Sequence, residues 1–452
     1  MRVRIGLISL PLLVVLVGCP ASPPAPPSTP KAPTMPATAP PATTNTTQPI
    51  EDDAVPDEPS LIAKLEKLGA KVSVDEDKQV TEVDLTSESL DKPEEANEVF
   101  DDLAKLTHLR RIVAFGPEIR NDQVAKIAGL KNLVAVELIN SNINDGGIEH
   151  LVGLTKLETL YIRRANLTDA GLEKLSVLKN LQRLDLRFTN VTNAGMPAVA
   201  KLPKLRALML EATKVSDAGL EPLTELKNLI KLNLWGELFT NAAAEHIKKM
   251  TTLEILELDD TRVKDDGLKQ LAGLTKMREL SLVRTRITNE GLTALKGMKE
   301  LRALQLRDTM STDPGLENIA GLTNLKKLDL SEGIYGDDGI KHLAGLKNLE
   351  ELKLWKIPVS NEGLGPITGL TNLKVLNLAE SRINDDGVKM LKPLANLEEL
   401  NLSITEISPA TLEFIPEFKK LKKLLINNCI QVSPDAKETL QKAMPGLKID
   451  GP

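Results

Sequence analysis

Hydrophobic positions recur every 24 residues through most of the chain. The pattern L-x-x-L-x-L begins at Leu133 and returns in step as far as Leu421, with one methionine among the leading leucines. Earlier copies begin at Leu109 and, 29 residues before it, at Val80. Side chains alternate along a strand, so the fourth and sixth residues of each copy face inward. Because a short strand needs a neighbour for its hydrogen bonds, the pattern predicts roughly fifteen stacked units that share one parallel sheet.

The second half of each unit predicts a short helix. When the residues of a unit are numbered from its first leucine, positions 12 and 13 mostly hold Thr, Ser or Asn followed by Asp or Asn, as in Thr168-Asp169. Such oxygens accept hydrogen bonds at a helix start, and we interpret these carboxylates as helix caps. Ser408-Pro409 places the cap at position 12 and Asp313-Pro314 places it at position 13, so both remain open. Position 15 is glycine in ten of the twelve units that begin between Leu133 and Leu397. Since glycine disfavours a helix, we expect neighbouring turns to approach closely there.

These motifs carry a family resemblance. L-x-x-L-x-L followed by T-D-x-G-L resembles the leucine-rich repeat of bacterial proteins and of eukaryotic F-box proteins, over about 370 residues. The resemblance implies an α/β fold, a leucine-rich-repeat solenoid with a curved parallel β-sheet on its concave side and short helices on its convex side. It also implies that position 9, most often threonine in this chain, forms hydrogen bonds between neighbouring units. Glu237, Gly333 and Ile357 break that position, and we expect local irregularity there.

The first residues predict export. Arg2 and Arg4 precede an apolar run, Ile5 to Val17, which is shorter than the roughly 20 residues that span a bilayer. The run ends in L-V-G-C, which resembles the lipobox of bacterial lipoproteins, with Cys19 as the lipid attachment site. Residues 1–19 are therefore expected to be a lipoprotein signal peptide. The mature protein would be anchored to the membrane of the bacterial cell envelope, at the outer membrane or cell surface, through its N-terminal lipid. The alternative is an uncleaved anchor with an incidental cysteine.

Composition divides the rest of the chain. Residues 20–59 are rich in Pro, Ala and Thr with little apolar bulk, which predicts a disordered linker. Residues 60–108 predict an N-terminal capping region of one helix, two strands around a turn within Lys71–Leu85, and a second helix. Residues 109–452 are the leucine-rich-repeat array with its C-terminal cap.

Chemistry that would mark an enzyme is absent from the sequence. The 57 Lys and Arg against 63 Asp and Glu give a net charge of −6, which does not favour nucleic-acid binding. His150, His246 and His342 recur four units apart, too far to share a metal ion, and no phosphate loop, H-E-x-x-H or G-x-S-x-G motif occurs. Asp-Asp pairs such as Asp265-Asp266 recur at the cap position and are better explained as structure than as calcium ligands. We therefore expect no catalysis, cofactor or metal.

The outward positions 5, 7 and 8 of each strand are free to specify a partner. Both tryptophans of the protein fall at position 7, and Trp, Tyr and Arg are frequent interface anchors. The candidate partner-binding residues are Tyr161, Arg163, Arg164, Arg187, Phe188, Trp235 and Trp355. We expect protein–protein interaction through the concave face. The alternatives are binding of a carbohydrate or cell-wall polymer, with the tryptophans as stacking platforms, and a purely structural role in the envelope.

Overall fold

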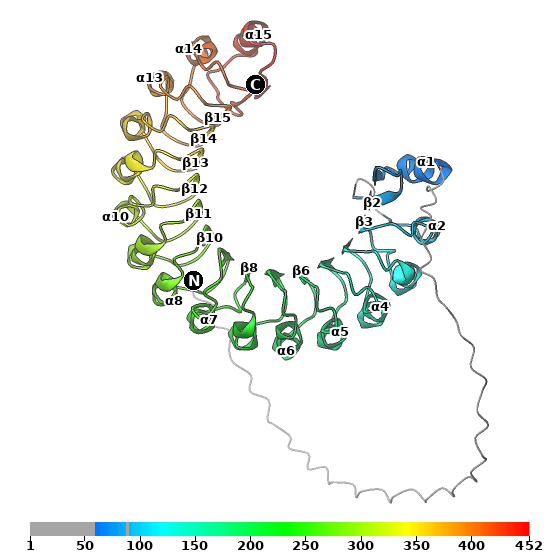
Figure 1. Cartoon of the computed structure of the whole chain (residues 1–452). Helices are drawn as coiled ribbons and strands as arrows, with labels where there is room; N and C mark the ends of the chain where they lie inside the picture. The colour runs from blue at the N-terminus through cyan, green and yellow to red at the C-terminus, as the bar shows by residue number, and fades with distance from the viewer. Residues whose placement is uncertain (1–58, 87–89, 452) are drawn as a thin grey trace, which may run out of the picture. The chain divides into compact units, whose positions relative to one another are not determined.

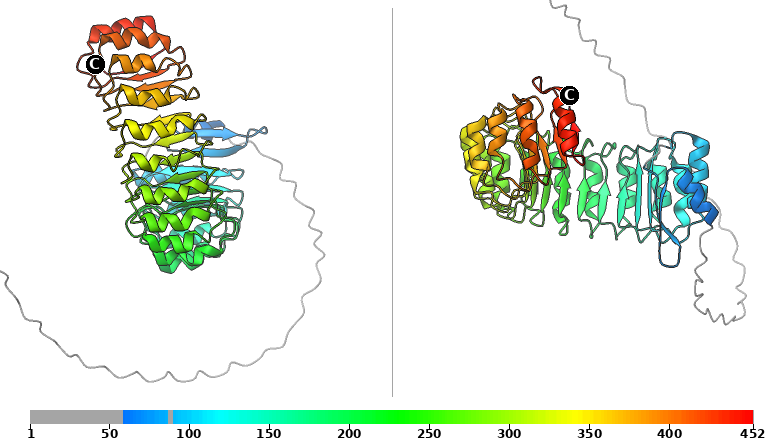
Figure 2. Two further views of the ribbon diagram at one scale, coloured as in Figure 1. Left: turned by 90° about the vertical axis from the view of Figure 1, so that its left-hand side faces the viewer. Right: turned by 90° about the horizontal axis from the view of Figure 1, so that it is seen from above.

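The computed structural model describes residues 59–86 and 90–451, which belong to one compact unit, Ala54–Pro452. In this unit the repeats stack into an arc with strands on the inner side and helices on the outer side (Figure 1). Viewed from the helix side, the helices lie one above another as successive rungs (Figure 2). The predicted signal peptide, Cys19 and nearly all of the predicted linker lie outside the described residues. No helix within the described ranges is long and apolar enough to cross a membrane.

Parallel strands form the inner face, and the predicted solenoid is confirmed. Each strand pairs with the next in 24-residue register, for example Leu160 with Leu184. The first step is longer, Val83 with Ile112, as the sequence predicts, and the last pairs Leu424 with Ile449, one residue out of period. The strands are β2 Val80–Asp84, β3 Arg111–Phe115, β4 Ala135–Ile139, β5 Thr159–Tyr161, β6 Arg183–Asp185, β7 Ala207–Met209, β8 Lys231–Asn233, β9 Ile255–Glu257, β10 Glu279–Ser281, β11 Ala303–Gln305, β12 Lys327–Asp329, β13 Glu351–Lys353, β14 Val375–Asn377, β15 Glu399–Asn401, β16 Lys423–Leu425 and β17 Lys448–Asp450.

A hairpin protects the N-terminal edge of this sheet. Strand β1, Lys71–Val74, pairs antiparallel with β2, so the first parallel strand is not left as an open edge. The two helices and the hairpin predicted for this region are all present, and Leu65 and Phe100 from the helices are buried in the same core as the repeats.

Short helices form the outer side. The α-helices are α1 Pro59–Lys67, α2 Pro93–Leu103, α3 Asn121–Lys126, α4 Asp145–Leu151, α5 Asp169–Leu175, α6 Met196–Ala200, α7 Asn241–Ile247, α8 Asp265–Gln270, α9 Asn289–Leu292, α10 Asp313–Leu316, α11 Asp337–Ile340, α12 Asn361–Leu364, α13 Asp385–Met390, α14 Pro409–Phe414 and α15 Pro434–Ala443. The 3₁₀ turns are Ile127–Gly129, Asn193–Gly195, Asp217–Leu220, Pro222–Glu225, Leu271–Gly273, Thr293–Gly297, Lys341–Gly345, Gly365–Ile367 and Ile415–Glu417. Leucines at positions 4 and 6 of the strands and position 16 of the helices are buried between the two sides, and each contributes roughly 1.5–3 kcal/mol.

The sequence suggested that the position-13 carboxylates cap their own helices, but the structure shows that they do not. The cap is position 12, where Thr168 Oγ1 accepts from Ala170 N at 3.3 Å. Asp169 instead accepts from the backbone N and the hydroxyl of Thr192, in the next unit, at 2.8 and 2.6 Å. We call this bond between units the clasp. The same bond to the backbone N–H of the next unit is made by Asn121, Asp145, Asn193, Asp217, Asn241, Asp265, Asn289, Asp313, Asp337, Asn361 and Asp385.

The clasp explains the glycine at position 15. A Cβ added at Gly171 would lie 2.5 Å from Oδ1 of Asp145 in the preceding unit. Two units carry another residue at position 15. Ala243 is buried there, and Thr411 donates its hydroxyl to Asp385 Oδ1 at 2.5 Å and so joins the clasp. The predicted close approach of neighbouring turns is therefore confirmed.

Position 9 does not connect neighbouring units through threonine, contrary to the expectation from the family. The hydroxyl of Thr189 donates to the carbonyl of Leu186 in its own unit at 2.6 Å. The residues that break the pattern at position 9 each have their own surroundings. At Gly333, the ring of Tyr335 occupies the space that a side chain would need, whereas Ile357 is buried in the core.

Candidate functional site

Positions 7 and 8 follow each strand at the inner edge of the arc. Position 8 adopts the left-handed backbone conformation, as at Arg164 (φ 60°) and Phe188 (φ 58°), although almost none of these residues is glycine. A left-handed L-residue costs roughly 1–2 kcal/mol. The N–H of Arg164 donates to the carbonyl of Arg187 in the next unit at 2.9 Å, which offsets part of that cost. The repeat therefore turns its backbone sharply where the candidate side chains begin.

The first group of candidate residues surrounds Phe188. The guanidinium carbons of Arg163 and Arg164 lie 5.2 and 4.9 Å from the centre of its ring. Cation–π contacts of this kind contribute about 0.5–1 kcal/mol at exposed sites. Arg164 is exposed, and Nε of Arg163 is buried without a hydrogen-bond partner among the described residues. The structure thus brings these three residues together, and no ion pair neutralises either arginine within the described part of the chain.

Arg187 and Tyr161 are more constrained than the sequence suggested. Arg187 contacts the buried carboxylate of Asp185 through Nε and Nη2, at 2.9 and 2.6 Å, and lies 3.6 Å from Glu211. The hydrogen bond with Asp185 raises the pKa of Arg187. Tyr161 is half-buried, and burial raises the pKa of its hydroxyl. Arg187 is therefore already paired with carboxylates of the protein itself and stabilises the sheet surface.

A second group surrounds Trp355. The guanidinium of Arg307 lies 4.9 Å from its ring centre and the ammonium of Lys356 lies 5.9 Å from it. The indole N–H donates to Glu380 Oε1 at 2.9 Å. Glu332 accepts from Arg307 Nε at 2.8 Å and from Lys356 Nζ at 3.3 Å, and the bond from Arg307 lowers the pKa of Glu332. The ring and the side chains that hold it therefore come from four successive units.

Glu332 and Glu380 were not among the outward residues that the sequence singled out, whereas Arg307 was. Glu332 and Glu380 occupy position 8 of the units on either side of Trp355. The signal that could have identified them is adjacency across one period, since the position-8 residue of the next unit lies beside a position-7 side chain.

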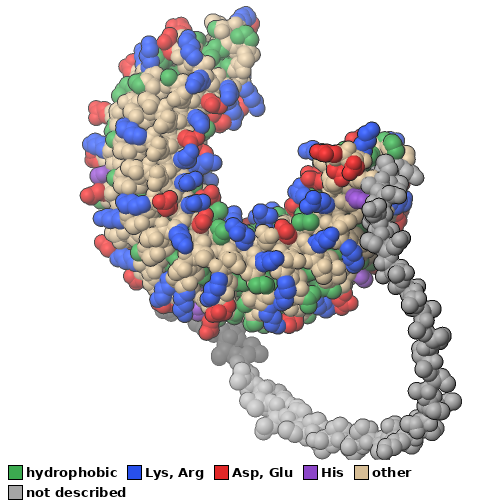
Figure 3. Space-filling view, viewed as in Figure 1, with side chains coloured by type: hydrophobic (Ala, Val, Ile, Leu, Met, Phe, Trp, Pro, Cys, Tyr) green, Lys and Arg blue, Asp and Glu red, His purple; other side chains and the backbone are tan. Residues whose placement is uncertain are grey.

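Trp235 stands apart from both groups. It is half-buried, and no cation lies over its ring among the described residues. The next unit places Asp259 at the same position, where burial raises the pKa of the carboxyl. Figure 3 shows basic side chains along the inner edge of the arc, interspersed with acidic ones. The structure does not bring Trp235 and Trp355 together, because five units separate them.

The aspartates and histidines that the sequence raised as metal ligands have other roles or positions in the structure. The carboxylate of Asp265 is in a clasp with Thr288, and that of Asp337 is in a clasp with Ser360. His150, His246 and His342 are partly exposed on the outer side. Within residues 59–86 and 90–451, no three His, Cys, Asp or Glu side chains gather so as to hold a metal ion.

Comparison with known families agrees with this architecture. A family model described as a leucine-rich repeat region matches residues 108–365, more than half of the chain, and a second leucine-rich-repeat model matches residues 369–392. The chain is a leucine-rich-repeat protein. No curated protein matches it significantly.

Solved structures of other leucine-rich-repeat proteins resemble this one in fold. An internalin of Listeria monocytogenes is 23% identical, with 86% of this chain and 92% of that chain covered and a TM-score of 0.47. A leucine-rich-repeat protein of Leptospira interrogans is 20% identical, with 72% and 91% covered and a TM-score of 0.47. A plant peptide hormone receptor in complex with its peptide is 15% identical, with 78% and 69% covered and a TM-score of 0.40.

Proposed function

We propose that this leucine-rich-repeat protein is a lipid-anchored binding module of the cell envelope that holds a protein partner against its concave face. A leucine-rich-repeat solenoid is a protein–protein interaction fold, because its stacked units present one extended surface. The observation that carries the proposal is the Trp355 group. Its indole is partly exposed, yet it is oriented by a hydrogen bond to Glu380 and by cations on its face.

Such preorganisation favours binding. An aromatic side chain that is already fixed loses less conformational entropy when a partner covers it, and each mobile side chain would cost about 0.5–1.5 kcal/mol to immobilise. The Phe188 group adds two arginines without carboxylate partners among the described residues, which suits a partner surface that bears acidic side chains. The proposed contact surface therefore runs along positions 7 and 8, from Phe188 to Trp355.

Crosslinking in the native envelope tests the proposal. Proteins crosslinked to the wild-type chain are compared with those crosslinked to the double variant Phe188→Ala/Trp355→Ala and to Lys276→Ala, a matched control on an exposed residue outside the concave face. We expect a partner that the wild type and the control capture and the double variant loses, with the unfolding midpoint of the double variant preserved. Equal capture by all three proteins would exclude the concave face as the binding surface.

Carbohydrate is the second candidate ligand, and Trp235 is the observation that favours it. Its partly exposed ring has no cation above it among the described residues, and a partly exposed indole can stack against a sugar. Binding to cell-wall glycans that is lost in Trp235→Ala and retained in Trp355→Ala would support this candidate. Loss in neither variant would count against it.

Lipid anchoring is the remaining part of the proposal. It is supported by the lipobox-like L-V-G-C sequence that ends at Cys19. Expression in a bacterium with a radiolabelled fatty acid should label the wild type and not Cys19→Ala, and only the wild type should sediment with membranes. A labelled Cys19→Ala protein would disprove attachment at this residue.

A further inference from the structure

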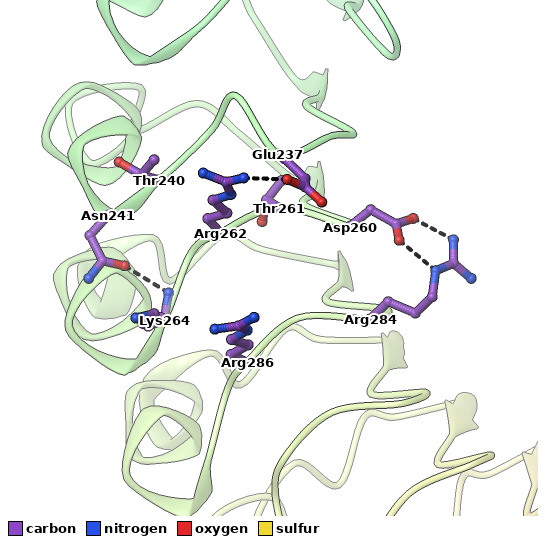
Figure 4. A pocket seen from close by; sticks show the side chains of 9 residues that line it. All are labelled: Glu237, Thr240, Asn241, Asp260, Thr261, Arg262, Lys264, Arg284 and Arg286. Carbon is purple, nitrogen blue, oxygen red and sulfur yellow. Dashed lines mark hydrogen bonds and ion pairs between the residues drawn. The ribbon is translucent and has the colours of Figure 1, made fainter. Parts of the chain in front are cut away.

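A basic hollow lies where the chain passes from strands β8, β9 and β10 to the helices that follow them, and its strand-side wall includes the position-8 residues Asp260 and Arg284. Its volume is about 810 Å³ (Figure 4). The residues that line it are Glu237, Thr240, Asn241, Asp260, Thr261, Arg262, Lys264, Arg284 and Arg286. Four cations against two carboxylates leave the lining with two positive charges in excess.

The excess charge belongs to two identifiable side chains. Arg262 pairs with Glu237, and Arg284 pairs with Asp260. The ammonium of Lys264 and the guanidinium of Arg286 form no ion pair within the described part of the chain. Two like charges that face one hollow repel each other, and an anion placed between them would remove that repulsion.

Lys264 also breaks the rule of the repeat at a cost to the fold. Position 12 normally supplies a cap, as when Thr288 Oγ1 accepts from Glu290 N at 3.3 Å. A lysine side chain has no acceptor, and helix α8, which follows Lys264, has no side-chain cap. The repeat therefore loses a stabilising bond here and gains an uncompensated cation.

Asn241, the clasp residue of the preceding unit, makes only one of the two clasp bonds with Lys264. Elsewhere the amide of a clasp asparagine donates to the next position-12 side chain, as Asn289 Nδ2 does to Thr312 Oγ1 at 2.8 Å. Asn241 keeps its bond to the backbone N of Lys264, at 2.7 Å, but Lys264 offers its Nδ2 no hydroxyl. Asn241 thus contributes a third donor to the lining of the hollow.

We infer that this hollow binds the phosphoryl group of an anionic ligand. Asn241 and Lys264 lie on its helix side and the Asp260–Arg284 pair on its strand side, with Arg286 between them (Figure 4). An ammonium, a guanidinium fork and an amide give donors of three geometries, which suit the several oxygens of a phosphate monoester dianion. That dianion matches the two excess charges, and the volume leaves room for the group that carries the phosphate.

Calorimetric titration of the full chain with inorganic phosphate at low ionic strength tests the inference. Lys264→Thr introduces the commonest residue at this position of the repeat, and Arg286→Ala removes the second free cation. Arg382→Ala is the matched control, because Arg382 is an exposed arginine at the same repeat position as Arg286 but in a distant unit. Lys264→Thr also separates loss of binding from loss of fold, since it regains a hydroxyl cap and should not lower the unfolding midpoint.

We expect phosphate to bind the wild type and Arg382→Ala equally and each of the other two variants at least about tenfold more weakly. Absence of binding to the wild type would overturn the inference, and so would undiminished binding to Lys264→Thr or Arg286→Ala. An equal loss in Arg382→Ala would show a response to net charge alone and would also overturn it. Succinate serves as a dicarboxylate dianion, and binding as tight as that of phosphate would overturn the assignment to a phosphoryl group.

Discussion

Asp169→Ala is the sharpest test of the clasp. Asp169 is the first residue of helix α5, yet its carboxylate accepts the backbone N–H and the hydroxyl of Thr192 in the next unit. If Asp169 capped its own helix, the variant would weaken that helix alone. If it connects two units, the variant weakens the interface between them, which in a solenoid is a separate contribution to stability.

The size of the effect follows from the two bonds. A hydrogen bond to a charged group contributes about 1.5–3 kcal/mol, and a buried donor left without a partner costs about 1–3 kcal/mol. Thr192 is only partly buried, so water can solvate part of what is lost and the lower end of these ranges applies. The better helix propensity of alanine offsets at most about 0.7 kcal/mol. We expect Asp169→Ala to lower the free energy of unfolding by about 2–3 kcal/mol.

The chain itself supplies the matched control, Asp169→Asn. Native clasp asparagines such as Asn193 accept the next backbone N–H at 2.8 Å and donate to the next hydroxyl at 2.9 Å. Asp169→Asn can make the same two bonds and should cost less than about 1 kcal/mol. Urea unfolding followed by circular dichroism measures both variants, and hydrogen exchange at the Thr192 amide should accelerate in Asp169→Ala only. Equal destabilisation by the two variants, or unchanged exchange at Thr192, would refute the clasp.

Three further predictions concern the repeat and its surface charges. A Cβ at Gly363 would lie 2.1 Å from the clasp oxygen of the preceding unit. Gly363→Ala should therefore destabilise the protein by about 1–3 kcal/mol in thermal unfolding, although alanine favours helices. A stabilised variant would contradict the steric explanation. Ala165 is buried at position 9 without a hydroxyl, and Ala165→Thr should gain about 0.5–1.5 kcal/mol by the bond that Thr189 makes; no gain would show that the slot lacks room. Hydrogen bonds from two lysines lower the pKa of Glu350 from 4.5 to about 2. The contribution of Glu350 to the free energy of unfolding is therefore present above pH 4.5 and is lost as the pH falls towards 2. Glu350→Gln should remove that contribution, of order 0.2–1 kcal/mol for each exposed pair, and an unchanged pH profile of stability would contradict the prediction.

Periodicity predicts most of this fold because each unit repeats the same physical requirement. The buried leucines at positions 4 and 6 and the 24-residue register could be read from the sequence, and so could the longer first step between Val83 and Ile112. The register of the last strand could not, because the C-terminal unit inserts one residue between Leu424 and Ile449 after the pattern has ended. A pattern predicts the interior of an array better than its ends.

Side-chain partners are the part that periodicity leaves open. The same oxygen of Asp169 suits a cap and a clasp, and only the position of Thr192 decides between them. The candidate binding residues show the same limit. The sequence places Arg163 and Arg187 at equivalent outward positions, but Asp185 holds Arg187 in an ion pair while Arg163 lies over an aromatic ring.

Departures from the repeat therefore separate into two kinds, and the difference bears on function. Some departures are compensated within the fold. Tyr335 fills the space beside Gly333, and Thr411, which replaces the usual glycine, donates its hydroxyl to the clasp carboxylate of Asp385. The departure at Lys264 is uncompensated, because helix α8 loses its side-chain cap and Asn241 loses a hydroxyl partner. A lost cap alone does not indicate a ligand, because Gly336 also leaves its helix, α11, without one. Lys264 adds to that loss a cation that is unpaired among the described residues, and this combination is better explained by a ligand than by architecture. The same criterion, applied unit by unit, distinguishes the Lys264 hollow from the many polar positions that serve the solenoid alone.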